Sequence, residues 1–489
     1  MSTLDHLPVI IGAGQSSQAV PDELDTAFGP VALAGEALRR ALDGLGLNAV
    51  DVCFGVRLFG DSGPAFPNPF GQSNNVPASV CAAAGISAGE YVYSHVGGQA
   101  PQTLVADAAR LLMEGRAETV AIVGAEAIAN VKAASRAGAS PDWSDAPDAA
   151  LTDRGLYPPG PFIVSGAAMT HRIAAPLYYY ALFETARRSA KGASREDYRQ
   201  TMAALWEDFA AVAADNPFAT VRTAPSAADI NTPGPKNPTI TTPYTKAMIA
   251  RDGVNQGAAV LLSTFGQAKA MGATDVTFLH AHAEGSDCTP IEREVFHASA
   301  AQAAVLDMIG EAGRAADMFD LYSCFPVVPL EAMELLGLKR GARPLTLTGG
   351  LPFFGGPGNN YSLHAIAEAH ARLRGTDRTA LVYANGGLAS KHAAGLYGGE
   401  PPETVSFDKF PQVEPARRIA GENPVGRLLS YTVEHRGGEP TGVLALGETD
   451  AGERFYARGG VDAAARFLAD DPLGEAVTTK THKGVNQLV

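Results

Sequence analysis

Two glycine-rich turns are the segments of this sequence whose residue types are best suited to chemistry. The first is VGGQAPQ, which begins at Val96, and the second is GGLPFFGGPGNN, which begins at Gly349. An apolar run of helical periodicity follows each turn, so each is expected to bring the N-terminus of a helix, with unpaired N–H groups, to a cleft. Such a pair of termini is suited to holding an oxyanion that develops on a bound carbonyl group.

The glycines of these turns are the candidate binding residues, because glycine permits a positive φ and a close approach of ligand to backbone. The expected oxyanion or thioester donors are Gly97, Gly98 and Gln99 in the first turn and Gly355, Gly356 and Gly358 in the second. The alternative is tight packing of each turn against a neighbouring strand. The occurrence of two matching turns favours the binding role.

Four side chains close to the turns or to strand ends are the candidate catalytic residues: Tyr322, His392, Asn385 and His95. Tyrosine and histidine can serve as acid or base, and asparagine can hold a carbonyl group or a water. For each of them, a buried or hydrogen-bonded structural role is the alternative. His280 and His282 have a spacing that can suit a metal, but no third ligand is evident, so no metal site is predicted.

A repeated order of elements is expected to position these residues. The run LPVIIGA from Leu7 corresponds to VTFLHAHA from Val276, and a helical pattern that begins with proline follows each of them. Strand-like segments come next (VDVCFGVRLFG and MFDLYSCFPVVPL), and then the glycine turn, a helix and a closing strand. Near-continuous apolar strands that alternate with helices predict an α/β protein with two duplicated halves and mostly parallel sheets.

Two further segments depart from this pattern. Residues 128–245 hold polar and proline-rich stretches around aromatic helical segments, which predicts an inserted lobe that flanks a cleft or, alternatively, only buries a sheet edge. After residue 399 the chain alternates apolar and polar residues and carries hairpin signals, which predicts a small β-barrel-like unit. The predicted boundaries are 1–127 and 246–399 for the two halves, 128–245 for the lobe and 400–489 for the β-rich unit.

Composition excludes several classes of function. The chain has 489 residues, and 38 Lys+Arg against 52 Asp+Glu give a net charge of −14, which argues against nucleic acid or an anionic membrane as a partner. Four cysteines without a CxxC pair indicate reduced thiols. The N-terminal residues do not resemble a signal peptide and no apolar run reaches about 18 residues, so a cytoplasmic protein without a signal peptide or a membrane segment is expected.

Taken together, the duplicated halves, the lobe and the glycine turns resemble the thiolase superfamily over residues 7–399. DLYSCFPVVPLEAMELLGL from Asp320 is similar to the His-Asp-Cys-Phe region of sterol-carrier-type thiolases, and GGLPFFGGPG resembles the stretch that normally carries Gly-His-Pro. VGGQAPQ and the β-rich tail look most like thiolase-like protein type 1, within the acetyl-CoA acetyltransferase family. The resemblance implies a layered αβαβα fold with an inserted loop lobe and a small C-terminal OB-like domain.

The reactive residues of a thiolase are missing from this sequence. The nucleophilic cysteine falls on Gly98 or Gln99, the Gly-His-Pro histidine on Gly356, and the Cys-x-Gly cysteine on Ala384. The resemblance therefore implies a protein that takes a coenzyme A thioester as substrate or ligand, with no covalently bound cofactor and without cysteine-dependent thiolysis.

Two alternatives remain open at this stage. The first is an aldolase or retro-aldolase that acts on β-hydroxyacyl-CoA, because sterol-side-chain aldolases of the superfamily have a tyrosine where Tyr322 stands. Their second tyrosine falls on Gly356, which is a departure from that pattern. The second alternative is a non-catalytic CoA-thioester binder or scaffold whose barrel recruits a protein partner. The resemblance allows a monomer or a homodimer.

Overall fold

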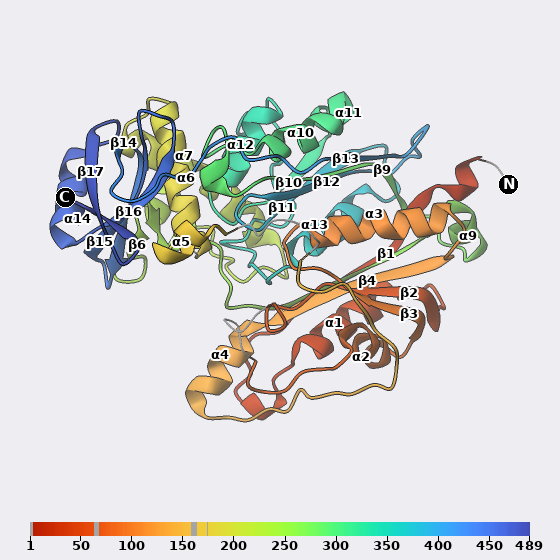
Figure 1. The fold of residues 1–489 in the computed structure, drawn as a ribbon. Coiled ribbons are helices and arrows are strands. Elements are labelled where there is room, and N and C mark those ends of the chain that lie inside the picture. The colour runs from red at the N-terminus through yellow and green to blue at the C-terminus, as the bar shows by residue number, and fades with distance from the viewer. Residues whose placement is uncertain (1–2, 63–67, 158–163, 174) are drawn as a thin grey trace.

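Two α/β halves with similar orders of elements form the core of the molecule, although no strand described in the second half corresponds to the third strand of the first (Figure 1). The computed structural model describes residues 3–62, 68–157, 164–173 and 175–489. The first half contains β1 (Pro8–Ser17), α1 (Pro30–Ala41), β2 (Ala49–Gly55), α2 (Val76–Ala84), β3 (Ser87–Tyr93), α3 (Ala100–Met113), β4 (Thr119–Ala127) and β8 (Asn255–Thr264). The second half contains β9 (Thr277–Ser286), α10 (Ala300–Met308), β10 (Met318–Leu321), α12 (Val327–Leu335), α13 (Tyr361–Leu373), β11 (Thr379–Gly386) and β12 (Lys391–Gly398).

The strands of the two halves are connected through β1 and β9, which pair at Val9–Phe278 and Ile10–Thr277. The strand order runs β10-β11-β12-β9-β1-β8-β4-β2-β3-β5, where β5 (Thr152–Asp153) is an edge strand. Pairing within each half is mixed, so the prediction of mostly parallel sheets holds only in part. β2 pairs in parallel with β3 and β4, whereas β12 runs antiparallel to β11 because only a short loop connects these two strands.

Helices α3 and α13 form the middle layer. Each of them contacts strands of both halves, and α13 is buried along almost its whole length. Its buried polar side chains have partners there, since His364 and Glu368 are both hydrogen-bonded to Gln15. The outer layers are α1 with α2 on the first half and α10 with α12 on the second, which confirms the layered αβαβα fold. Both glycine turns therefore lead into helices at the centre of the molecule.

The inserted segment consists mainly of helices. Its elements are α4 (Ile128–Ala137), α5 (Gly166–Thr170), α6 (Pro176–Ala190), α7 (Arg195–Asp215), α8 (Ala227–Asn231), β6 (Thr239–Thr241) and β7 (Tyr244–Thr245). Buried aromatic residues of α6 and α7 pack in one hydrophobic cluster with residues of α12 and of the C-terminal strand β15. The lobe is thus packed against the second half and the C-terminal unit.

The C-terminal unit is a small closed barrel, as predicted. Its elements are β14 (Val425–Arg436), β15 (Glu439–Glu448), β16 (Arg454–Gly459), α14 (Val461–Asp470), β17 (Ala476–His482) and β18 (Val485–Leu488). The strands pair around a ring, and β14 additionally pairs with β6 of the lobe. β13 (Ser406–Phe410) does not belong to the barrel and pairs in parallel with β9 of the core.

Two expectations for the second half were wrong in detail. The run MFDLYSCFPVVPL is a strand only over Met318–Leu321, and helix α12 begins at Val327. A short buried apolar run does not distinguish strand from helix by its periodicity, which explains this error. The helix expected from Pro290 begins only at Ala300, because residues 290–292 form a separate 3-10 turn and Ser299 caps α10. The short helices α9 (Phe265–Ala270) and α11 (Gly310–Arg314) complete the core.

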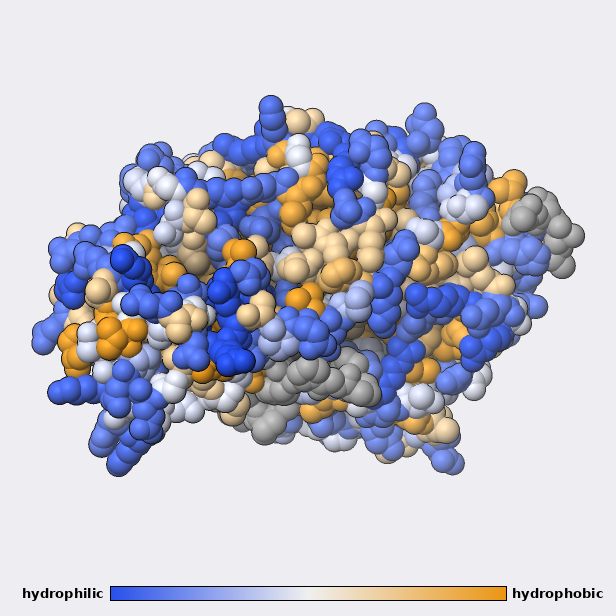
Figure 2. Space-filling view, turned by 45° about the horizontal axis from the view of Figure 1, so that its top comes forward, coloured by the Kyte–Doolittle hydropathy of each residue, from blue (hydrophilic) through white to orange (hydrophobic). Residues whose placement is uncertain are grey.

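Hydrophilic residues cover most of the face in Figure 2, with hydrophobic residues in smaller groups between them. Among the described residues, no helix has both the length and the apolar character that crossing a membrane would need.

Candidate functional site

The first glycine turn delivers free backbone donors to the interior. Gly97 has a φ of +144°, which favours glycine, and its N–H donates to Asn359 Oδ1 at 3.0 Å. The N–H groups of Gly98 and Gln99 donate to no acceptor within the described part of the chain. Because α3 begins at Ala100, these two groups lie at the positive end of its dipole.

Position 98 has no room for a side chain. A Cβ atom there would lie 2.5 Å from the Tyr322 hydroxyl oxygen and 2.5 Å from the Asn385 carbonyl oxygen. Real Cβ atoms do not approach other atoms so closely, so these two residues fill the space into which a residue at 98 would project. The structure therefore brings three predicted site residues together at one point.

Most N–H groups of the second glycine turn already donate to acceptors within the protein. Gly356 donates to the Arg251 carbonyl oxygen at 2.8 Å and Gly358 donates to the Gly356 carbonyl oxygen at 2.8 Å. Gly355, with a φ of +129°, has an N–H that meets no acceptor among the described residues. Of the three glycines predicted here as donors, only Gly355 retains a free N–H.

Asn359 connects the two turns, and sequence analysis did not single it out. Its side-chain oxygen accepts from Gly97, and its Nδ2 donates to the Arg57 carbonyl oxygen at 2.7 Å. Ser362, in the first turn of α13, donates to the Gly98 carbonyl oxygen at 2.5 Å. The asparagine pair in GGPGNN was the available signal, since asparagine side chains commonly satisfy backbone groups in turns.

Cys324 lies beside Asn385 in the structure, although the two residues are far apart in the sequence. The Asn385 amide donates to the Tyr180 hydroxyl at 2.9 Å and approaches Cys324 Sγ at 3.8 Å. Burial raises the pKa of Cys324 to about 12, and burial together with Cys324 raises the pKa of Tyr322 far above its ordinary value. Both groups therefore stay protonated at neutral pH, so each can donate a hydrogen bond but cannot act as a base.

The Asn385 side-chain oxygen is an unsatisfied acceptor. It is buried and has no hydrogen-bond partner among the described residues. A buried polar atom without a partner is costly, and such atoms are often found where a ligand or water binds. The role predicted for Asn385, holding a carbonyl group or a water, stays a prediction that this buried acceptor is suited to.

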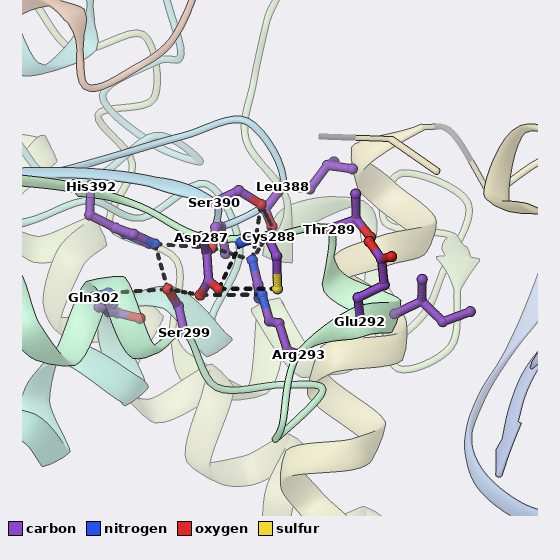
Figure 3. A network of polar contacts seen from close by, with 12 residues as sticks. Asp287, Cys288, Thr289, Glu292, Arg293, Ser299, Gln302, Leu388, Ser390 and His392 are labelled. Carbon is purple, nitrogen blue, oxygen red and sulfur yellow. Dashed lines mark hydrogen bonds and ion pairs between the residues drawn. The ribbon is translucent and has the colours of Figure 1, made fainter. Parts of the chain in front are cut away.

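His392 is held in a buried network rather than left free (Figure 3). Its Nδ1 lies 2.7 Å from the Tyr383 hydroxyl, and its Nε2 lies 2.9 Å from Ser299 Oγ and 3.0 Å from the Ala389 carbonyl oxygen. Ser299 in turn donates to Asp287 Oδ2 at 2.6 Å. Burial lowers the pKa of His392 to about 3, so the ring is neutral and has no nitrogen to spare for a substrate.

Arg293 fixes the loop that connects β11 and β12. Its guanidinium is almost fully buried and donates to the Ala389 carbonyl oxygen at 2.6 Å and to Ser390 Oγ at 2.9 Å (Figure 3). It also lies 3.4 Å from Asp287 Oδ2. This loop carries Asn385 on one side and His392 on the other, so Arg293 positions both of them.

A cavity of 440 Å³ lies beside the N-terminus of α3, and we call it the α3 cavity. His95, Gln99 and His392 line it, whereas Tyr322 and Asn385 do not. His95 Nδ1 lies 3.0 Å from the Gly155 carbonyl oxygen, and burial, with the nearby Arg154, lowers the pKa of His95. The predicted site residues thus fall into two groups. Gly98, Tyr322 and Asn385 meet at the first glycine turn, which we call the glycine-turn centre, and His95, Gln99 and His392 line the neighbouring α3 cavity.

No group of three histidine, cysteine or acidic side chains in the described ranges is arranged to hold a metal ion. His280 is instead hydrogen-bonded to the Glu400 carbonyl oxygen at 2.8 Å.

Comparison with known proteins assigns the fold. No protein-family model matches the chain, and no curated protein matches it. Among solved structures, the monomeric SCP2-thiolase-like protein type 1 from Mycobacterium smegmatis is 30% identical, with 99% of each chain covered and a TM-score of 0.79.

Two more distant structures share the thiolase core. The Ltp2–ChsH2(DUF35) aldolase is 18% identical, covers 81% of this chain and 98% of its own, and has a TM-score of 0.57. The Acat5 thiolase from Ascaris suum, solved in complex with coenzyme A, is 13% identical, covers 80% and 99%, and has a TM-score of 0.52. These two likenesses concern the fold alone. The likeness to the M. smegmatis protein extends over the whole chain, lobe and barrel included, and on that ground this chain belongs to the SCP2-thiolase-like proteins of the thiolase superfamily.

Proposed function

We propose that this chain binds an acyl-CoA thioester at the glycine-turn centre without forming a covalent acyl-enzyme. The observation that carries the proposal is the geometry at Gly98. Its N–H and that of Gln99 are free donors at a helix N-terminus, while Tyr322 and Asn385 occupy the space of a nucleophilic side chain. Such a site can polarise a thioester carbonyl but has no group that can attack it.

The chemistry of the cysteines supports this proposal. Thiolysis requires a thiolate, because the thiol itself is a weak nucleophile. Cys53, Cys81 and Cys288 are buried, and the high pKa of Cys324 keeps its thiol protonated at neutral pH. Coenzyme A as the carrier is taken from the complex of the Ascaris suum thiolase and is part of the proposal for this chain.

The first experiment is isothermal titration calorimetry of acetyl-CoA and of free CoA, followed by mass-spectrometric analysis of products. The substrates are 3-ketoacyl-, 3-hydroxyacyl- and acetyl-CoA, with and without free CoA. We expect saturable binding of the thioester and no CoA-dependent cleavage of the 3-ketoacyl-CoA. Such cleavage, or the absence of any binding, would contradict the proposal.

Carbon–carbon lyase activity on a 3-hydroxyacyl-CoA is the second candidate, and the position of the Tyr322 hydroxyl favours it. The hydroxyl lies against Gly98 and donates to no acceptor among the described residues. Because the phenol is neutral, it would donate a hydrogen bond to the enolate oxygen that forms when the carbon–carbon bond breaks, and another group would be the base.

Tyr322→Phe separates the two candidates, with Tyr91→Phe on β3 as the control variant. If the protein is a lyase, release of a carbonyl compound and a shorter thioester falls in Tyr322→Phe alone. If it only binds the thioester, neither variant shows turnover, and the affinity for acetyl-CoA changes little. Turnover that is equal in both variants excludes the role of Tyr322.

A further inference from the structure

The α3 cavity holds more positive than negative charge. Four cationic side chains (Arg110, Arg154, Lys391 and Lys409) and two carboxylates (Asp107 and Glu284) line it. The whole chain carries a net charge of −14, so this excess is a local feature that runs against the overall charge. A cavity lined by one sign of charge concentrates small ions of the opposite sign.

The two carboxylates are already paired. Asp107 lies 2.6 Å from Arg154 and 3.4 Å from Arg110. Glu284 lies 2.9 Å from Lys409 and also accepts from Thr103 Oγ1 at 3.2 Å. Lys391 is therefore the cation of the cavity that remains without a counter-ion among the described residues.

Lys391 is buried beside uncharged groups, which is unusual for a lysine. It is only 9% exposed, and its ammonium group donates to the Val96 carbonyl oxygen at 3.3 Å. The ring of Tyr157 lies 5.1 Å away. Neither neighbour carries a negative charge, and burial lowers the pKa of Lys391. Burying a cation without a counter-ion is costly, and a bound anion would remove that cost.

We propose that the α3 cavity binds a small organic anion, whose carboxylate or phosphate-monoester group pairs with Lys391. The lining also contains the apolar side chains of Leu104, Phe410 and Pro411, so the ligand carries a short carbon skeleton beside its anionic group. Phe410 and Pro411 come from the end of β13 and the residue after it, which means that the segment leading to the barrel completes the cavity. The proposal does not rest on acyl-CoA binding.

The pKa of His95 can report whether an anion binds inside the α3 cavity. Burial lowers its pKa, and the charges of Arg154, Lys391 and Arg57 lower it further, whereas the Gly155 carbonyl oxygen raises it. An anion bound beside Lys391 would screen these cations. The pKa of His95 should therefore rise when the ligand binds, and a merely structural role of Lys391 would not produce this response to added anion.

The test is calorimetric titration of the full chain with inorganic phosphate and, separately, with malonate. We expect saturable binding of at least one of them, and preference for phosphate or malonate identifies the anionic group. Lys391→Met should weaken that binding about tenfold or more, the loss expected for one charge-assisted hydrogen bond. Lys269→Met, which removes an exposed lysine paired with Asp5, should leave the affinity unchanged.

Nuclear magnetic resonance of the histidine ring protons, with His95 assigned through His95→Gln, gives a second measurement on the wild-type chain. A rise in the pKa of His95 upon addition of the anion supports the proposal, even if Lys391→Met does not fold. Failure of both phosphate and malonate to bind would overturn it. Equal binding by wild type and a folded Lys391→Met would overturn it as well.

Discussion

Gly98 shows how the packing around one glycine limits which side chain can stand at that position. The N–H group of this residue remains available, whereas the volume beside its Cα is taken by Tyr322 and by the Asn385 carbonyl oxygen. A cysteine introduced at 98 would therefore have no space for its thiol, because Tyr322 and Asn385 fill the volume into which it would project.

Gly98→Ala tests this packing. The added methyl group would meet the Tyr322 hydroxyl and a backbone oxygen, so we expect a loss of about 1–3 kcal/mol in the free energy of unfolding, measured by urea denaturation. Gly421→Ala is the matched control, because a Cβ there meets nothing within 4 Å. Equal stability of the two variants would show that position 98 can accommodate a side chain.

Glu126 should give the stability of the protein a dependence on pH. This carboxyl is buried and accepts from the Phe59 N–H at 2.8 Å, and burial raises its pKa to about 8. The folded state therefore holds a proton that the unfolded state releases near its ordinary pKa of about 4.5, so stability falls as pH rises between these values.

Glu126→Gln removes the titration of this group and should reduce the decrease in stability with rising pH. Glu118→Gln, at an exposed position, should leave that decrease unchanged. The measurement is the urea midpoint between pH 5 and pH 9. Because burial also raises the pKa of Glu184 to about 7, some decline should remain below that pH in Glu126→Gln. Identical profiles for both variants and the wild type would contradict the assignment.

At the scale of elements, the β11–β12 loop shows what the sequence can and cannot predict. The order of strands and helices and the two glycine turns follow from local periodicity and could be predicted. The contact of Tyr322 with Gly98, the link from Asn359 to Gly97 and the capture of His392 by Ser299 join residues far apart in the chain. No local pattern encodes such contacts, which is why the sequence could offer His392 as a candidate base but could not identify its hydrogen-bond partners.

Arg293→Met should loosen this loop. The substitution removes the donors to residues 388–390 and leaves Asp287 buried without its cation, so we expect a loss of about 3–5 kcal/mol in the free energy of unfolding. Arg314→Met removes an exposed pair with Asp307 and should cost about 0–1 kcal/mol. Urea denaturation measures both, and similar losses would mean that Arg293 does not hold the loop.

At the scale of the whole molecule, the barrel is joined to the rest of the chain by many polar contacts. Arg188 pairs with Asp471 at 2.7 Å, Ser430 donates to the Leu182 carbonyl oxygen at 2.6 Å, and Arg454 donates to the Glu294 carbonyl oxygen at 2.8 Å. Leu444, Leu446 and Tyr456 of the barrel belong to the same hydrophobic cluster as the lobe helices. We therefore expect the barrel to unfold together with the rest of the chain.

Differential scanning calorimetry should accordingly show a single unfolding transition for the full chain. A variant truncated after residue 417, which keeps β13 in the core, would expose the apolar face of α6 that packs against β14, and we expect it to aggregate when expressed. Two separate transitions in the full chain, or a truncated variant that stays folded and monodisperse, would show that the barrel is an independent unit.

The position of β1 in the sheet has a consequence for the order of events during synthesis. Among the described residues, β1 pairs with β8 and β9 alone, and β8 ends at Thr264. During synthesis β1 must therefore wait without a partner strand until β8 has been translated. Nascent chains shorter than this have an open sheet edge, and they are the form of the protein that most needs protection by chaperones.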